Sequence, residues 1–224
     1  MLIEENILKV QEQLLENVTL IAVSKTRSIE EIKEAYKTGV RDFGENKVQE
    51  LVSKFDYIND DVRWHLIGHL QKNKVKYVVG KVWLIHSLDS IDLLKEIEKQ
   101  YSKKNEIANV LIQVNIGREG SKTGVLLEAL PELITECEKC SNVQVNGLMA
   151  IIPIGDDESC KFYFKQMKDI YDDLGKKDFR NIKMKCLSMG MSNDYKLAME
   201  EGSNMVRVGE GIFGKRNYNN KQEE

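Results

Sequence analysis

Short runs rich in β-branched residues alternate along this chain with longer, charge-rich segments whose apolar residues recur at helical spacing. The alternation continues almost to the end of the sequence, which is typical of repeated βα units. It predicts eight strands: Thr19 to Val23, Val40 to Phe43, Arg63 to Ile67, Trp83 to His86, Asn109 to Val114, Val143 to Met149, Lys185 to Ser188 and Met205 to Val208.

The segments between these strands predict seven helices, and the first 18 residues predict one more at the N-terminus. The seven cover Ser28 to Lys37, Lys47 to Ile58, Asn73 to Val79, Ser90 to Lys103, Pro131 to Lys139, Asp156 to Leu174 and Asp194 to Glu200.

Eight strands alternating with helices in 224 residues predict a single α/β domain, a (β/α)8 TIM barrel with an extra N-terminal helix. The rival fold is a doubly wound sheet, which favours a glycine-rich loop after its first strand, whereas Val23 to Arg27 contains no glycine. No linker interrupts the alternation, so we expect one domain over residues 1–216. The polar tail, residues 217–224, is expected to fray.

Charge and cysteine content limit the classes of partner. A net charge of −3 offers no basic excess for nucleic acid or an anionic membrane, and no apolar run approaches the roughly 20 residues of a membrane span. Acidic residues stand where a signal peptide would be basic, and four scattered cysteines predict no disulfide framework. We therefore expect a cytoplasmic protein whose partners are small molecules or proteins.

In a barrel, functional side chains follow the carboxyl ends of the strands, and the first candidate is Lys25. It follows the predicted first strand and precedes Ser28 and Glu31, which have the spacing of a capping box. A lysine in an apolar barrel mouth loses hydration, so its neutral amine is favoured and can form a Schiff base with an aldehyde. The simpler interpretation is a solvated loop lysine.

Glycine-containing turns follow the predicted seventh and eighth strands. They are Leu187 to Asp194 and Val206 to Gly214, and the first contains a Ser/Asn/Asp helix cap. Such turns bind phosphate through closely approaching backbone N–H groups, although each alone is more often a simple turn. Barrel closure brings both beside Lys25. A lysine next to a phosphate site indicates a phosphorylated aldehyde, and pyridoxal 5′-phosphate fits this description.

Several motifs in this order resemble the pyridoxal phosphate homeostasis protein family, whose barrel is similar to the N-terminal domain of alanine racemase, fold type III of these cofactor proteins. Besides the two glycine-containing turns, the matching segments are Ala22 to Thr26 (AVSKT), Phe43 to Glu50 (FGENKVQE), Trp64 to Lys74 (WHLIGHLQKNK) and Gly147 to Met149 (GLM). The resemblance covers nearly the whole chain.

The resemblance implies roles for particular residues. Lys25 corresponds to the Schiff-base lysine, Ser192 to a phosphate ligand, and Arg207 to the arginine that faces the pyridine nitrogen. The backbone N–H groups of Gly209 and Glu210 are similar to those that complete the phosphate cradle. Three further positions match residues that line the pocket, without an assigned role: Asn46, His65 and Met189.

An arginine keeps its proton, so Arg207 would leave the cofactor ring a weak electron sink. Racemisation would also need a second acid or base, which alanine racemase takes from a second domain that we do not expect here. The sequence and the resemblance together favour a non-enzymatic carrier that delivers the cofactor to apo-enzymes over a catalyst.

The expected carrier is a monomer that holds pyridoxal phosphate as a Schiff base on Lys25 within intracellular vitamin B6 homeostasis. Two alternatives stay open. One is a pyridoxal phosphate-dependent racemase-like enzyme, which would turn over amino acids. The other is a barrel that binds a different phosphorylated metabolite without a covalent bond. No metal is expected, because Cys137 and Cys140 have no second pair and Gly68 and the strand pattern separate His65 from His69.

Overall fold

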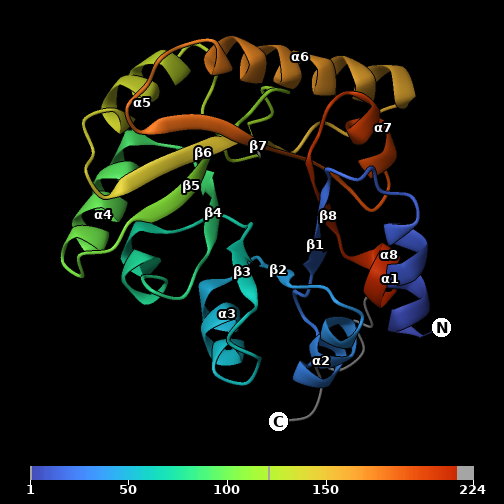
Figure 1. The fold of residues 1–224 in the computed structure, drawn as a ribbon. Coiled ribbons are helices and arrows are strands. Elements are labelled where there is room, and N and C mark those ends of the chain that lie inside the picture. Colours follow the sequence, from blue (N-terminus) through green and yellow to red (C-terminus); the bar gives the residue numbers. More distant parts are fainter. Residues whose placement is uncertain (1, 121, 216–224) are drawn as a thin grey trace.

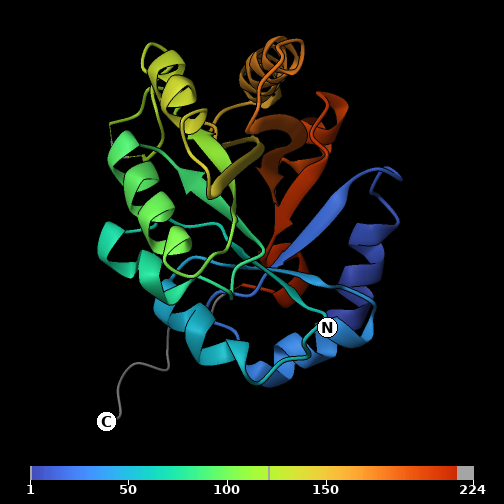
Figure 2. The ribbon, with the colours of Figure 1, turned by 60° about the vertical axis from the view of Figure 1, so that its left-hand side comes forward.

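Eight parallel strands form a closed barrel in the computed structural model, which describes residues 2–120 and 122–215. Each strand pairs with the next in the chain, and β8 returns to β1, so the predicted fold is confirmed. Figures 1 and 2 show the helices outside the strands. The strands are β1 (Thr19–Val23), β2 (Asp42–Glu45), β3 (Arg63–Leu66), β4 (Leu84–Leu88), β5 (Ala108–Val114), β6 (Val143–Ala150), β7 (Ile182–Met191) and β8 (Met205–Val208).

The helices follow the predicted order, and their buried apolar stripes pack on the outside of the barrel. They are α1 (Ile3–Gln11), α2 (Ile29–Lys37), α3 (Val48–Phe55), the 3-10 helix η1 (Lys72–Tyr77), α4 (Ile91–Ser102), α5 (Leu130–Cys137), α6 (Asp157–Gly175), α7 (Tyr195–Glu200) and α8 (Glu210–Phe213). None of these described helices combines the length and apolar character needed to cross a membrane.

Four elements differ from the sequence prediction. Helix α1 ends at Gln11, whereas the first 18 residues predicted a helix. The segment expected as an α-helix from Asn73 to Val79 is the 3-10 helix η1, a form common in short connectors. Strand β7 extends beyond the predicted Lys185 to Ser188. Its first half alternates exposed and partly buried residues, so it lacks the apolar run on which the prediction depended. The short helix α8 was not expected, since its sequence begins beside two glycines. The predicted tail, residues 217–224, lies outside the described part of the chain.

The core has an outer and an inner layer. The larger cluster lies between strands and helices and includes Phe43, Leu51 and Phe164, which are almost completely buried. A smaller cluster fills the inside of the barrel with residues from five strands: Ile21, Leu84, Leu111, Met149 and Met205. Polar side chains share this interior, including two fully buried histidines described below. Side chains of alternate strand residues therefore divide between packing against the helices and filling the barrel.

Helix α1 packs against α8 (Figure 1). The side-chain amide of the buried Asn6 donates a hydrogen bond of 2.8 Å to the carbonyl oxygen of Ile212. Nearby, the Tyr195 hydroxyl of α7 bonds to Gln13 Oε1 at 2.5 Å. These contacts join the beginning of the described chain to its end, on the side of the barrel where the turn after β8 lies.

Candidate cofactor-binding site

A cavity of about 430 Å³ lies at the carboxyl ends of the strands. Its size falls within the roughly 300–1,000 Å³ that is usual for small-molecule sites. Its wall is formed by residues that follow or end β1, β2, β3, β6, β7 and β8. Six of the eight residues singled out from the sequence line it: Lys25, Asn46, Ser192, Arg207, Gly209 and Glu210.

The other two candidates, His65 and Met189, do not line this cavity. Side chains alternate along a strand, so Met189 packs in the outer core while its neighbour Ser188 faces the barrel interior. His65 faces the interior one layer below the mouth, where it is 1% exposed. Ile67, which directly follows β3, lines the cavity instead. The structure therefore gives these two residues surroundings different from those implied by the resemblance.

The residue before Lys25 is fixed by a buried polar cluster. The Ser24 hydroxyl donates to Glu45 Oε1 at 2.6 Å. The ammonium group of Lys54, on α3, donates to the Ser24 carbonyl oxygen at 2.9 Å, to Glu45 Oε1 at 2.9 Å and to Glu50 Oε1 at 2.7 Å. Burial raises the pKa of Glu45, while the charge of Lys54 acts in the opposite direction. This cluster anchors the end of β1 to α3.

The residue after Lys25 is also held in place. Thr26 adopts a left-handed backbone with φ of 64°, and its N–H donates to Glu50 Oε1 at 2.5 Å. Ser28 and Glu31 then form the predicted capping box at the start of α2. Lys25 itself is partly buried and lines the cavity. Its backbone is therefore fixed on both sides, which reduces the entropy lost when its side chain engages a ligand.

Backbone donors converge beside Ser192 on the cavity wall. The N–H groups of Gly209 and Gly211 both point at Ser192 Oγ, at 3.1 and 3.3 Å. A Cβ added at Gly211 would lie 2.9 Å from Val208 Cγ1, so this close turn requires glycine. The turn before it is ordered by Asp194 Oδ1, which accepts from the Met191 N–H at 2.5 Å. Of the two predicted cradle donors, Gly209 has its N–H beside Ser192, and backbone N–H groups at such a turn suit an anionic group.

Arg207 lies in the wall of the cavity and is only 4% exposed. Its Nη1 donates to the Ser188 carbonyl oxygen at 2.8 Å and to Ser188 Oγ at 2.7 Å, and its Nη2 donates to the Ala150 carbonyl oxygen at 2.9 Å. Burial lowers the pKa of Arg207 to about 10, although the charge of Asp194 opposes this. The guanidinium group therefore stays protonated at neutral pH.

The charged groups that support the backbone around Lys25 were not predicted from the sequence. Glu45, Glu50 and Lys54 belong to or follow the FGENKVQE motif, so their shared i, i+4 and i, i+9 spacing toward one buried point was present but unrecognised. The apolar segment 151–155 also lines the cavity and gave no chemical signal, because isoleucine and proline resemble ordinary core or loop residues.

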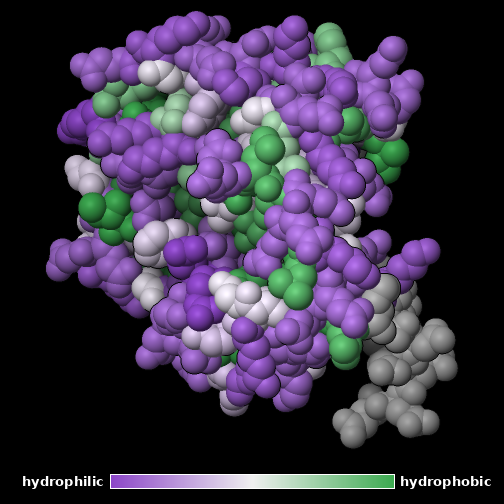
Figure 3. Space-filling view, turned by 45° about the vertical axis from the view of Figure 1, so that its right-hand side comes forward, coloured by the Kyte–Doolittle hydropathy of each residue, from purple (hydrophilic) through white to green (hydrophobic). Residues whose placement is uncertain are grey.

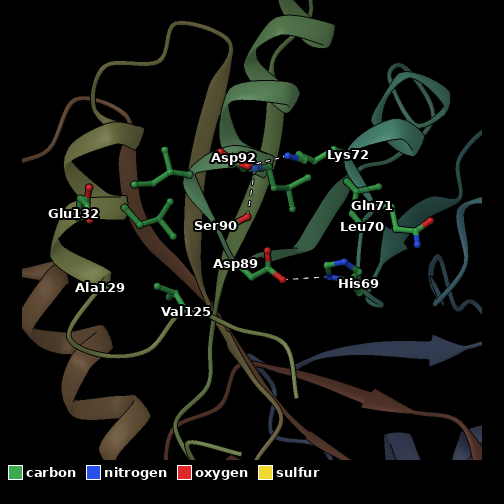
Figure 4. Close-up of a pocket in the computed structure, with 13 residues that line it drawn as sticks. His69, Leu70, Gln71, Lys72, Asp89, Ser90, Asp92, Val125, Ala129 and Glu132 are labelled. Atoms are coloured by element: carbon green, nitrogen blue, oxygen red, sulfur yellow. Dashed lines mark hydrogen bonds and ion pairs between the residues drawn. The ribbon is translucent and has the colours of Figure 1, made fainter. Parts of the chain in front are cut away.

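A second cavity, of about 650 Å³, lies near the ends of β3, β4 and β5. Figure 4 shows two pairs of polar side chains that face each other, His69 with Asp89 and Lys72 with Asp92. The distances are 3.2 Å from His69 Nδ1 to Asp89 Oδ2 and 2.8 Å from Lys72 Nζ to Asp92 Oδ2. None of the eight sequence-predicted residues lines it.

The molecular surface in Figure 3 is mostly hydrophilic, with hydrophobic residues exposed near the middle of the face shown.

The cysteines and histidines do not assemble into a metal site in the described part of the chain. All four cysteines are free, and Cys137 and Cys140 are both buried. Burial raises the pKa of the Cys140 thiol to about 11 and that of Cys137 further. Within residues 2–120 and 122–215, no three His, Cys, Asp or Glu side chains are grouped closely enough to hold an ion.

Comparison with known proteins identifies related sequences and structures. Residues 2–217 match the family model for the N-terminal domain of alanine racemase. The pyridoxal phosphate homeostasis protein of Aquifex aeolicus is 45% identical over 201 residues, which are 89% of this chain and 87% of that protein.

Solved structures give the same result. PipY of Synechococcus elongatus is 34% identical, with 95% of this chain and 100% of that chain covered. The TM-score is 0.90 for the structure of PipY without pyridoxal phosphate and 0.87 for the one with it bound. Alanine racemase of Clostridium difficile shares the fold at 18% identity, with a TM-score of 0.75 over 97% of this chain and 60% of that one.

Proposed function

The chain belongs to the family of pyridoxal phosphate homeostasis proteins, and from this premise we propose that it binds pyridoxal 5′-phosphate and acts in intracellular vitamin B6 homeostasis. The observation that carries the proposal is the meeting of Lys25, a backbone anion cradle and a buried arginine in one cavity. These are an amine, an anion site and a fixed cation, which match the aldehyde, the phosphate and the ring nitrogen of this cofactor.

Each part of the cavity has a distinct task in this proposal. The backbone N–H groups of Gly209 and Glu210, together with Ser192, would hold the phosphate, and Arg207 would face the ring nitrogen. Lys25 would hold the aldehyde carbon of pyridoxal phosphate covalently through its amine, with loss of one water molecule. Water reverses this condensation, so a covalently held cofactor can still be released.

Carriage without turnover follows from the same residues. Arg207 keeps its proton at neutral pH, so it does not protonate the pyridine nitrogen, and the ring delocalises a carbanion poorly. Racemisation also needs a second acid or base. Besides Lys25 and Arg207, the titratable side chains among the described residues that line the cavity are Asp157, Cys160, Asp194 and Glu210, with no tyrosine or histidine. We therefore propose that the protein supplies cofactor to apo-enzymes and does not catalyse amino-acid racemisation.

The covalent site is tested by absorption spectroscopy of the purified protein after incubation with pyridoxal phosphate. We expect an imine band that borohydride converts to a fixed adduct, which mass spectrometry of peptides locates on Lys25. Lys25→Ala should lose the band. Lys72→Ala is the matched control, because it removes a lysine from the second cavity and should keep the band.

Three outcomes would contradict this assignment. A colourless protein that still binds the cofactor would mean a non-covalent phosphate site. An adduct on Lys72 would move the site to the second cavity. Racemisation of amino acids by the loaded protein, abolished in Lys25→Ala, would establish the enzyme that the proposal excludes.

The carrier role is tested by mixing the loaded protein with an apo-aminotransferase and an excess of a scavenger for free pyridoxal phosphate. Activation that exceeds the activation by an equal amount of free cofactor indicates direct transfer. Activation that the scavenger abolishes indicates release into solution and no delivery. We further propose that the protein is a cytoplasmic monomer. Its four free thiols support this compartment, and light scattering would test the monomeric mass.

A further inference from the structure

A continuous chain of hydrogen bonds crosses the inside of the barrel and ends at the cavity. Asp42 Oδ1 lies 2.9 Å from His65 Nε2, and His65 Nδ1 lies 2.9 Å from His86 Nε2. His86 Nδ1 lies 3.1 Å from Ser188 Oγ, which is 2.7 Å from Arg207 Nη1. None of the five residues is more than 6% exposed, and they come from β2, β3, β4, β7 and β8.

The first group in the chain fixes its direction. Burial raises the pKa of Asp42, but hydrogen bonds from Arg63 and His65 outweigh this and lower it to about 2. Asp42 is therefore a carboxylate at neutral pH and only accepts hydrogen bonds. His65 must then donate from Nε2. At the other end of the chain Arg207 can only donate, so the Ser188 hydroxyl proton is left for His86 Nδ1. His86 then donates from Nε2, and His65 Nδ1 accepts that hydrogen bond.

The same accounting continues to the cavity. Burial lowers the pKa of His86 well below its ordinary value, and the charge of Arg207 acts in the same direction, so the His86 ring is neutral. His86 Nδ1 is then an acceptor for the Ser188 hydroxyl proton. A serine has one proton and two lone pairs, so the lone pairs of Ser188 Oγ face Arg207. Every hydrogen bond thus runs from Arg207 toward Asp42.

This direction determines how Arg207 is held. Both N–H groups of Nη1 are used by Ser188, and one N–H of Nη2 is used by the Ala150 carbonyl oxygen. If Ser188 pointed its proton at Arg207, two positive groups would face each other in a buried site. The hydroxyl is kept from this orientation by His86, which is kept in its tautomer by His65 and Asp42.

We propose that His65, His86 and Ser188 form a one-way relay that fixes the orientation of the Arg207 guanidinium group and so positions the cofactor ring, a role for positioning residues that do not touch the cofactor. The ring part of this inference rests on the proposed function. If the two histidines only filled the core, their hydrogen bonds could run in either direction, and changing that direction would not affect ligand binding in the cavity.

The first test uses the ligand-free protein and does not depend on any cofactor. Nitrogen-proton NMR correlations of the imidazole rings report which nitrogen carries the proton, and the chain has only three histidines. His69→Gln removes the exposed one and completes the assignment. We expect His65 and His86 both to be protonated on Nε2 alone at neutral pH. A proton on Nδ1 of His86 would overturn the direction of the relay.

The second test removes one hydroxyl group. Ser188→Ala leaves His86 Nδ1 without its donor and Arg207 without one acceptor. Ser87→Ala is the matched control. Ser87, on β4, is fully buried like Ser188, but its hydroxyl has no partner among the described residues. We expect Ser188→Ala to shift the ring nitrogens of His86, to move the absorption band of the loaded protein and to weaken binding of pyridoxal phosphate about tenfold or more, which is about 1.4 kcal/mol. Ser87→Ala should change none of these.

The two proposals fail in different ways. If wild type does not bind pyridoxal phosphate but shows the expected tautomers, the proposed function is wrong and the relay in the empty protein stands. If wild type binds and Ser188→Ala gives the same affinity, band and ring signals, the relay is wrong. Ser188→Thr keeps the hydroxyl and should restore the wild-type signals. If Ser188→Ala does not fold, the tautomers of the wild type still decide the direction.

Discussion

Two carboxylates and one ammonium group hold the backbone on both sides of Lys25. Glu45, Glu50 and Lys54 meet at one point, and Lys54 is the only one of them that also binds the Ser24 carbonyl oxygen. Burying any one of these three charged groups without its partners would be costly, so the cluster is stable only when all three are present. The position of Lys25 therefore depends on charges that belong to β2 and α3.

Removing the cation should expose this dependence. Lys54→Met leaves the buried Glu45 without its counter-charge, so we expect the free energy of unfolding to fall by about 3–5 kcal/mol. Chemical denaturation measures the change. Lys33→Met, at an exposed position of α2, should change it by less than about 0.5 kcal/mol. A Lys54→Met variant as stable as Lys33→Met would show that the cluster contributes no stability.

Asp42 should make stability depend on acid pH. Its pKa is about 2 in the folded protein against 3.8 as the ordinary value, so the folded state binds this proton more weakly than the unfolded state. The stabilisation is present above pH 3.8 and is lost as pH falls toward about 2. The difference in pKa corresponds to about 2 kcal/mol. We expect the stability difference between wild type and Asp42→Asn to shrink over this range, and a difference independent of pH would contradict the assignment.

At the scale of whole elements, the strands were predictable where a short apolar run is bounded by polar residues on both sides. The limits of β1 and β8 agree with the prediction, and the other strands agree within a few residues except for β7. A bulge depends on how a strand pairs with its neighbour, and in a barrel the two are separate segments of the sequence. The residues of one strand alone therefore did not predict the bulges. One example is the shift in register between Val145 and Gly147 on β6.

Gly147 shows what that bulge requires. Its φ is +142°, and a Cβ there would lie 1.8 Å from the Cys186 carbonyl oxygen on β7. We expect Gly147→Ala to lower the free energy of unfolding by about 3–5 kcal/mol, because backbone strain and a backbone clash add together. Gly39→Ala is the control: φ there is +94° but nothing lies within 4 Å, so only the conformational cost of about 1–2 kcal/mol applies. Equal losses in thermal or chemical unfolding would contradict this reasoning.

At the scale of the whole molecule, the barrel was predictable because its alternating pattern has few other solutions, and the family motifs then indicated the mouth. Six predicted residues line one cavity, although their roles stay predictions. The support behind them was not predictable. His65, His86 and Ser188 are far apart in sequence, and only closure of the barrel brings them into one chain.

Cofactor binding should stabilise the whole molecule. A ligand that binds only the folded state at about one hundred times its Kd adds about 2.7 kcal/mol. For a chain of this size, that corresponds to a rise in Tm of about 5–10 °C. We expect calorimetry to show this rise with pyridoxal phosphate for wild type and a smaller one for Lys25→Ala. An equal rise in both proteins would mean that the lysine adds nothing to binding.

The contact between α1 and α8 has a consequence for synthesis on the ribosome. Lys25 leaves the ribosome early, whereas Arg207, Gly209 and Gly211 are among the last residues of the barrel to emerge. A growing chain carries the amine but has neither the cradle nor the buried arginine, and α1 has no α8 to pack against. On the proposed function, a growing chain would therefore not retain pyridoxal phosphate, and binding would begin only once β8 has closed against β1.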